Sequence, residues 1–276
     1  MVDSIRDQMA RLKTHEPELK VGASPLIRRV CFFPDSHFPF NIPMDGFLSF
    51  LREFRPHTFI FGGDNLDPWA ISHWNEPNWL RFGLENILNE FRELISRFTE
   101  HLDQILTILP HQCEVIYLIG NHEDWIEQFK AKFPQIKGDG LPELLGPIAS
   151  RIKFLPRYSF YRIGNLTFCH GEHFETQNPA KLYVEKCKTT VVFGHHHYAQ
   201  MWPDFSMVDD ENKYFGFSTP CWTSKKAHYG KHQPNRWQNG FFTACIKEKS
   251  GNFSPHPMLA SPQGHFIDLY GQEFCN

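Results

Sequence analysis

Five short polar motifs carry the residues that could do chemistry, and each follows an apolar run. They are Asp35-Ser36-His37, Gly63-Asp64-Asn65-Leu66-Asp67, Gly120-Asn121-His122-Glu123, His170-Gly171 and Gly194-His195-His196-His197. Two of the motifs offer side chains two residues apart, which on an extended segment point to one face and can converge on one ion. Carboxylate, imidazole and carboxamide groups without a thiolate are typical ligands of manganese, iron, zinc or magnesium.

The number of candidate ligands favours two metal ions over one. The seven candidates are Asp35, His37, Asp64, Asn121, His170, His195 and His197. A single tetrahedral or octahedral ion that keeps a position open for substrate cannot use so many. Each motif alone has a simpler interpretation, because an isolated histidine is usually a core or surface residue. All five together, in this order and at strand ends, predict one shared site.

The elements that must position these residues are strands of a largely parallel sheet. Apolar runs at 27–34, 57–63 and 114–120 predict buried strands, and the apolar spacing from about 78 to 109 predicts a long helix between the second and the third. Such βαβ units bind ligands outside the carboxyl ends of their strands. The apolar face of the helix packs on the sheet or, as the alternative, forms a dimer coiled coil.

Closely spaced strands follow a Pro/Gly-rich connection at 133–147. Strands are expected at 153–156, 158–164, 165–171 and 189–194, with a short helix near 179–188, and antiparallel strands are expected beyond residue 198. No linker separates two domains. We therefore expect an N-terminal arm or helix over residues 1–26 and a single α/β domain with two sheets over residues 27–276.

Composition excludes several classes of protein. The 276 residues include 41% hydrophobic residues and 27 Phe, which a disordered chain does not have. The formal charge of −3 means that any nucleic-acid contact must come from a local patch. No run approaches the ~20 apolar residues that cross a bilayer, and the N-terminus has no signal-peptide core, so we expect a cytoplasmic protein without a membrane partner. Seven scattered cysteines predict reduced, mostly buried thiols.

The five motifs, in this order, resemble the signature of the calcineurin-like metallophosphoesterase superfamily. The resemblance implies a four-layer α/β/β/α sandwich of two mixed sheets. It also implies one metal on Asp35, His37 and His197, a second on Asn121, His170 and His195, and Asp64 bridging both. Mn²⁺ is the expected metal, with Fe, Zn, Ni or Mg as alternatives. His196 falls at the variable position of the last motif, and His173 lies just after the His170-Gly171 motif. Neither histidine is therefore assigned as a metal ligand.

The resemblance further implies a general acid at His122, with Asp67 as the carboxylate that orients it. The alternative for Asp67 is a helix N-cap before Pro68. Two cations lower the pKa of a water bridging them, and the resulting hydroxide attacks phosphorus in line. The implied activity is that of a metal-dependent phosphoric ester hydrolase.

A basic, aromatic segment from Cys221 to Trp237 bears on the substrate. It contains Lys225, Lys226 and Arg236, interleaved with Trp222, Tyr229 and Trp237, and no acidic residue. This pattern suits a phosphodiester backbone with bases that stack, and a solvated loop is the alternative. The run at 234–241 is also similar to a stretch in phage-encoded members of the superfamily.

The expected substrate class follows from this segment and from one difference between the chain and the motif of phosphoprotein phosphatases. After Asp67 the chain reads Pro68-Trp69-Ala70 and lacks the arginine of phosphoprotein phosphatases. We therefore expect a phosphodiesterase or nuclease acting on nucleotides or nucleic acid. A phosphomonoesterase for a phosphoprotein or nucleotide, and a non-catalytic metal-bound scaffold, are the alternatives. The motifs do not distinguish diesters from monoesters, and nothing in the sequence sets the oligomeric state, a dimer included.

Overall fold

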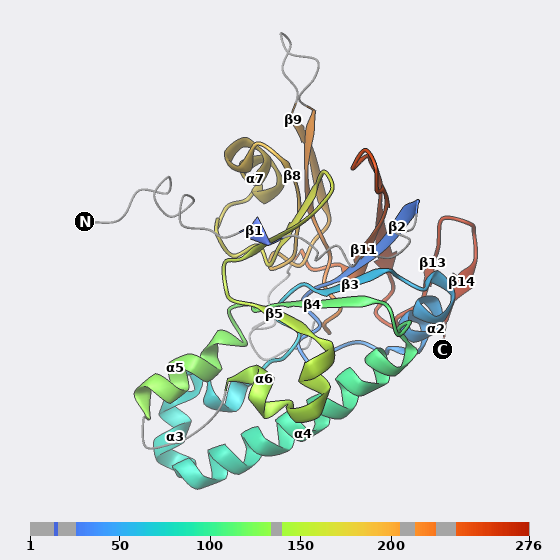
Figure 1. Cartoon of the computed structure of the whole chain (residues 1–276). Coiled ribbons are helices and arrows are strands. Elements are labelled where there is room, and N and C mark those ends of the chain that lie inside the picture. The colour runs from blue at the N-terminus through green and yellow to red at the C-terminus, as the bar shows by residue number, and fades with distance from the viewer. Residues whose placement is uncertain (1–13, 16–25, 134–139, 205–212, 225–235, 276) are drawn as a thin grey trace.

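Two mixed sheets stacked between helices form the protein (Figure 1). The structure is a computed structural model that describes residues 14–15, 26–133, 140–204, 213–224 and 236–275. Within these ranges each of the two large sheets has six strands. Helices cover the outer face of both sheets, so the expected four-layer α/β/β/α fold is confirmed.

The first sheet has the order β12-β11-β2-β3-β4-β5. Its strands are β2 (Ile27–Phe33), β3 (Thr58–Phe61), β4 (Glu114–Leu118), β5 (Lys153–Leu155), β11 (Asn239–Lys247) and β12 (Phe253–Ala260). β2 to β5 run parallel, whereas β11 is antiparallel to β2 and β12. The parallel strands are continuous apolar runs because both of their faces are covered.

The second sheet has the order β1-β6-β7-β8-β10-β9. Its strands are β1 (Thr14–His15), β6 (Phe160–Ile163), β7 (Leu166–Cys169), β8 (Thr190–Phe193), β9 (Gln200–Asp204) and β10 (Tyr214–Ser218). Of the strands beyond residue 198, β9 and β10 pair antiparallel as expected, and β10 also pairs parallel with β8. The N-terminal arm or helix lies outside the described residues, apart from β1 and Leu26.

Apolar side chains fill the space between the sheets. Val30, Phe32 and Ile60 from the first sheet meet Phe168 and Val192 from the second in one buried cluster. The rings of Phe32 and Phe168 lie 5.5 Å apart. This contact holds the carboxyl ends of β2 and β7 at the same end of the stack.

The helices form the two outer layers. On the first sheet lie α2 (Asp45–Phe54), α3 (Glu76–Phe82), α4 (Leu84–Ile108), α5 (Asp124–Lys132) and α6 (Leu141–Leu144), together with the short 3-10 turns η1 (Trp69–Ile71), η2 (His73–Asn75) and η3 (Gly146–Arg151). On the second sheet lies α7 (Pro179–Cys187), as predicted near 179–188. No helix in the described ranges is both long and apolar enough to span a membrane.

The predicted helix from about 78 to 109 is two helices. Gly83 ends α3 with φ 79° and ψ 144°, a conformation that is open almost only to glycine. Beyond it, α4 buries Ile87, Phe91 and Ile95 in the same cluster as sheet residues such as Phe61. The apolar face therefore packs on the sheet, which is the first of the two expected arrangements.

Some short or irregular strands have no counterpart in the sequence expectations. β12 contains Pro255 and Pro257, and it forms the edge of its sheet, where proline is tolerated. A small hairpin of β13 (Phe266–Ile267) and β14 (Glu273–Phe274) ends the described chain. The seven cysteines are free, and four of them are buried, as expected.

Candidate metal centre

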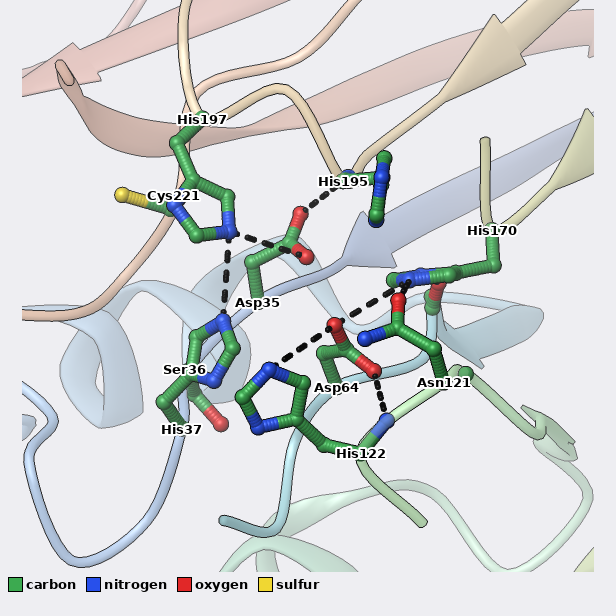
Figure 2. A network of polar contacts seen from close by, with 12 residues as sticks. Asp35, Ser36, His37, Asp64, Asn121, His122, His170, His195, His197 and Cys221 are labelled. Atoms are coloured by element: carbon green, nitrogen blue, oxygen red, sulfur yellow. Dashed lines mark hydrogen bonds and ion pairs between the residues drawn. The ribbon is translucent and has the colours of Figure 1, made fainter. Parts of the chain in front are cut away.

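The polar motifs meet where the strands of both sheets end. The loops after β2, β3 and β4 bring Asp35, Asp64 and Asn121, and the loops after β7 and β8 bring His170, His195 and His197 (Figure 2). In each sheet these strands run parallel, so their carboxyl ends lie on one edge. All seven predicted ligands are in one region.

One group consists of Asp35, His37 and His197, and all three side chains are buried. The Nε2 atoms of His37 and His197 face each other at 3.2 Å, and Asp35 Oδ1 lies 3.4 Å from His197 Nε2. Asp35 Oδ1 accepts no hydrogen bond within the described structure. Burial, followed by the charges of His122 and His197, lowers the pKa of His37 well below its usual range, so His37 is a neutral imidazole. Metal ligation requires that neutral form.

A second group consists of Asp64, His170 and His195, with Asn121 beside it. His170 Nδ1 lies 3.0 Å from the carbonyl oxygen of Gly62, which can only accept, so Nδ1 carries the proton. His170 Nε2 then faces Asp64 Oδ2 and Asn121 Oδ1, each at 3.2 Å. Burial lowers the pKa of His170, but Asp64 raises it to about 10.

In the second group, a metal ion would take the place of the proton that Asp64 holds on His170. Burial opposes ionisation of Asp64, yet His170 and His122 hold its pKa well below its usual range. Burial and the charge of His170 lower the pKa of His195, which keeps that ring neutral. The two groups supply carboxylate oxygens and imidazole nitrogens, with an amide oxygen beside the second. This donor set fits two divalent metal ions.

The backbone at these positions is unusual. Five of the eight described non-glycine residues with positive φ are predicted ligands. They are Asp35 (52°), His37 (47°), Asp64 (50°), His195 (66°) and His197 (62°). Left-handed conformations are disfavoured for residues with a Cβ, and they cluster at functional sites.

His122 lies between the two groups and is not part of either predicted ligand set. Its backbone N–H donates to Asp64 Oδ1 at 2.8 Å, and its Nε2 lies 3.8 Å from Asp64 Oδ2. Its ring packs 4.0 Å from Trp125. Burial lowers the pKa of His122, while Asp64 and Asp67 outweigh burial and raise it. The side chain can therefore carry a proton at the edge of the site.

Asp67 is buried, and its Oδ1 lies 3.5 Å from His122 Nδ1. The alternative role of Asp67 as a helix N-cap is wrong. The residue before η1 is Pro68, and no side chain caps this turn.

Glu123 has a structural role that the sequence reasoning missed. This buried carboxylate accepts five hydrogen bonds of 2.7 to 3.0 Å, from the backbone N–H groups of Asp64, Asn65, Leu66 and Gly120 and from the Tyr117 hydroxyl. Burial and the charge of Asp64 raise its pKa, while the donors lower it. Glu123 thereby fixes the loop that carries Asp64. Its place directly after His122 in the motif was the signal available.

An aromatic cleft of about 770 Å³ opens beside the ligands, and the sequence reasoning missed it too. Asn121, His122 and His195 form part of its lining. The other lining residues include Trp69, Trp74, Trp125, Arg157, Tyr158 and Glu172. Trp69 and Trp125 stand close to predicted motifs, which was a usable signal, whereas nothing in the sequence marked Tyr158.

The residues of the predicted substrate-binding segment, Cys221 to Trp237, have three different outcomes. Lys225, Lys226 and Tyr229 lie outside the described residues. Arg236 is exposed and stays a prediction, and the ring of neighbouring Trp237 lies 4.5 Å from His197. Trp222 was wrongly expected to face substrate.

Trp222 is fully buried, because it belongs to the core under β2. Its ring packs against Phe33, Phe47 and Phe241. Its backbone N–H donates to the Asp35 carbonyl oxygen at 3.0 Å, so this residue supports the Asp35 loop from behind.

The solved structures that are similar to the chain include two phosphoesterase-like proteins of low sequence identity. Wild-type Vps29 from Entamoeba histolytica in complex with Zn²⁺ shares 14% identity at a TM-score of 0.39, over 83% of this chain and 97% of that chain. A predicted phosphoesterase from Streptococcus pneumoniae shares 10% identity at a TM-score of 0.36, over 92% of this chain and 100% of that chain. Comparison with curated proteins gave no match.

The family model for calcineurin-like phosphoesterases matches residues 28–238. These residues are most of the chain and include all five motifs. The chain therefore belongs to the calcineurin-like phosphoesterase family.

Proposed function

We propose that the protein is a two-metal hydrolase of phosphodiesters in nucleotides or nucleic acid. The observation that carries the proposal is the convergence of two buried ligand groups, with His122 beside them, on an open cleft. An ester phosphate that enters the cleft reaches both groups and a protonated side chain at once. Membership of the phosphoesterase family supports the reaction class.

The metal sites in this proposal follow the two groups. Asp35, His37 and His197 would hold one ion, and Asn121, His170 and His195 would hold the other. Asp64 would bridge the two ions, because its carboxylate lies 3.2 Å from His170 Nε2 and its carbonyl oxygen accepts the backbone N–H of His37 at 3.0 Å. Bound there, divalent ions, with Mn²⁺ as the expected metal, supply Lewis-acid chemistry that activates water and neutralises phosphoryl charge.

His122 is the proposed general acid. It lines the cleft, and Asp67, 3.5 Å from its Nδ1, orients the ring so that Nε2 faces the site. Trp125 at 4.0 Å limits rotation of that ring. A leaving alkoxide with a high pKa needs a proton as the ester bond breaks, and a positioned imidazolium supplies it.

The charge of the cleft favours a diester over a monoester. Among the described residues that line it, Arg157 is the only Lys or Arg. Its guanidinium is paired with Glu172 at 2.8 and 2.9 Å and with Asp124 at 2.7 Å. A monoester dianion brings more negative charge than a diester monoanion. This cleft offers no unpaired guanidinium to balance the difference.

The proposal is tested by removing metal with a chelator and adding back manganese, nickel, zinc or magnesium. Bis(p-nitrophenyl) phosphate and p-nitrophenyl phosphate serve as the diester and the monoester. We expect hydrolysis only with added metal, and a higher kcat/KM for the diester. Hydrolysis of the monoester alone would replace the diesterase by a phosphomonoesterase. If neither ester is hydrolysed with any of these metals, the phosphodiesterase is contradicted and the non-catalytic, metal-bound scaffold is the alternative that stands.

A further inference from the structure

The cleft beside the metal centre has aromatic walls. Trp69 in η1, Trp74 in η2, Trp125 in α5 and Tyr158 before β6 line it. These residues come from the segment between β3 and α3, from α5 and from the turn before β6, yet they line the same cleft as Asn121 and His122. Trp69 and Trp125 meet edge to face with ring centroids 6.5 Å apart. A planar, apolar group therefore finds several ring faces here.

Two of these aromatic side chains are open to solvent. Trp74 is 68% exposed and Tyr158 is 42% exposed, whereas Trp125 is 5% exposed. His73 packs 4.5 Å from Trp74, and Arg157 lies 4.6 Å from the centre of the Tyr158 ring. Each open ring thus has a neighbour that helps to hold it. Exposed, supported aromatic rings at the mouth of a cleft are suited to stacking with a base.

The charges of the cleft argue against a second phosphate. Arg157 is balanced by Glu172 and Asp124, and Glu175 is a further, exposed carboxylate in the lining. Among the Asp, Glu, Lys and Arg side chains of the described lining, the two carboxylates of Glu172 and Glu175 outnumber the one guanidinium of Arg157. An uncharged ring can enter the cleft, whereas the phosphates of a strand that continues through it are repelled.

The position of His122 decides which part of the substrate enters the cleft. His122 is the proposed acid and packs against Trp125, so the group that receives its proton lies on the aromatic side. In the hydrolysis, the oxygen of water bonds to phosphorus and the P–O bond to the departing alcohol breaks. The departing oxygen takes the proton of His122, which recovers one from water. The group in the cleft is therefore the leaving group.

We propose that this aromatic cleft, walled by Trp74, Trp125 and Tyr158, binds the base of a departing nucleoside, so that the substrate is a phosphodiester of a single nucleoside. The proposal rests on the proposed function and narrows it. It assigns the specificity for the base to aromatic rings outside the predicted ligand set. In this proposal the cleft binds one base and not a nucleic-acid strand that runs along it.

Two esters with the same scissile bond test the proposal on the metal-loaded protein. Adenosine 5′-(methyl phosphate) and ribose 5-(methyl phosphate) differ only in the base. We expect kcat/KM to be about 10-fold higher for the adenosine ester, the size of effect that stacking on one aromatic side chain gives. Trp74→Ala and Tyr158→Ala should each remove most of this preference, because kcat/KM falls more for the adenosine ester than for the ribose ester. Trp74→Phe should restore it.

Matched controls come from exposed aromatic residues elsewhere in the chain. Trp202 in β9 is 39% exposed and Tyr270 is 94% exposed, and neither lines the cleft. Trp202→Ala and Tyr270→Ala should keep the preference for the adenosine ester. Equal kcat/KM for the two esters in the wild type, or equal losses on both esters in Trp74→Ala and Tyr158→Ala, would overturn the proposal.

Binding of adenosine itself separates this proposal from the proposed function, since adenosine has no ester to hydrolyse. Calorimetric titration of the metal-loaded protein should detect adenosine, and Trp74→Ala should weaken its binding by about 10-fold. Adenosine binding without any hydrolysis would keep the base site and overturn the phosphodiesterase. Hydrolysis without adenosine binding would keep the phosphodiesterase and overturn the base site.

A further ester distinguishes one base from a continuing strand. Adenosine 5′-(methyl phosphate) that carries an additional 3′-phosphate places a second anion on the leaving side. We expect a lower kcat/KM than for the parent ester, with partial recovery in Glu175→Gln. Faster hydrolysis of the 3′-phosphorylated ester would favour a nucleic-acid strand and overturn the single-nucleoside substrate.

Discussion

Asp64 links the two halves of the site through its two oxygens. Oδ1 accepts the backbone N–H of His122 at 2.8 Å, and Oδ2 faces His170 Nε2 at 3.2 Å. Its carboxylate is also 1% exposed, so its charge is not dispersed by water. A change of charge at this one position therefore acts on the proposed metal sites and on the proposed acid together.

Asp64→Asn is expected to abolish hydrolysis and to lower the content of bound metal, because a neutral bridge weakens both sites. Metal content by elemental analysis and turnover of the diester check this. The matched control is Asp204→Asn in β9, where Asp204 forms a partly exposed ion pair with Lys188, and this variant should behave as wild type. Wild-type turnover in Asp64→Asn would remove the two-metal interpretation.

His122→Gln is expected to retain metal but to lose ~10²–10⁴ in turnover of esters with alkoxide leaving groups. The loss on a p-nitrophenyl ester should be smaller, because nitrophenolate leaves without a proton. Steady-state kinetics on both esters, with metal content measured alongside, give the comparison. Equal losses on the two esters would assign His122 to binding or to packing against Trp125.

At the scale of elements, the site depends on loops that are held together by a buried carboxylate. Glu123 precedes α5 and accepts hydrogen bonds from the loops after both β3 and β4. A glutamine at this position keeps the shape but replaces one acceptor oxygen by an N–H₂ group. That group faces backbone donors and leaves at least one of them without an acceptor.

Glu123→Gln is therefore expected to cost ~1–3 kcal/mol in the free energy of unfolding, the cost of a buried donor without an acceptor. Urea denaturation measures this loss. Metal affinity should also fall, since the Asp64 loop loses its anchor. Glu127→Gln, on the exposed side of α5 beside Lys130, is the control and should change stability little. Equal unfolding midpoints for the two variants would contradict the anchoring role.

Sequence patterns predicted the elements that end in polar motifs, because a buried parallel strand followed by a polar turn is a local signal. The break at Gly83 was missed, since the apolar spacing continues on both sides of it and only the backbone changes direction. β12 was missed because its prolines argue against a strand unless the strand is known to lie at an edge. Both features depend on tertiary structure, namely the direction of the backbone after Gly83 and the position of β12 at the edge of its sheet.

The same limit applied to the candidate site. Which side chains converge could be predicted, as all seven predicted ligands gather at the strand ends. Which aromatic residue faces the substrate could not. Trp222 lies in the core and Trp74 is exposed, although the chain around Trp222 is the more basic. Burial depends on packing partners such as Phe47 that are distant in sequence.

At the scale of the whole molecule, one buried histidine joins the helical layer to the loop of the first ligand group. His101 of α4 is 9% exposed, and its ring stacks 4.9 Å from Phe38, the neighbour of His37. Burial lowers its pKa from 6.5 to about 4. The unfolded chain therefore binds a proton at a pH where the folded chain does not.

Folding stability is accordingly expected to fall as the pH drops from about 6.5 to about 4, and the His101 contribution to that fall is up to ~3 kcal/mol. Below the folded pKa no further loss arises from this group. Urea midpoints of the wild type and of His101→Phe at pH 7 and pH 4.5 isolate the contribution. The variant should lose less stability than the wild type over this interval. Identical losses would show that His101 is protonated equally in both states.

The positive φ angles of five predicted ligands have a consequence for protein engineering. Each such residue costs ~1 kcal/mol relative to glycine in the same conformation. At Asp35 and Asp64 the hydrogen bonds from the backbone N–H groups of His195 and His122 offset this cost, whereas His37, His195 and His197 are places where the metal-free fold gains stability by losing them. Directed evolution for heat resistance alone would therefore favour Gly or Asn at these positions. Thermostable variants raised without a screen for turnover would be enriched in inactive proteins with an intact core.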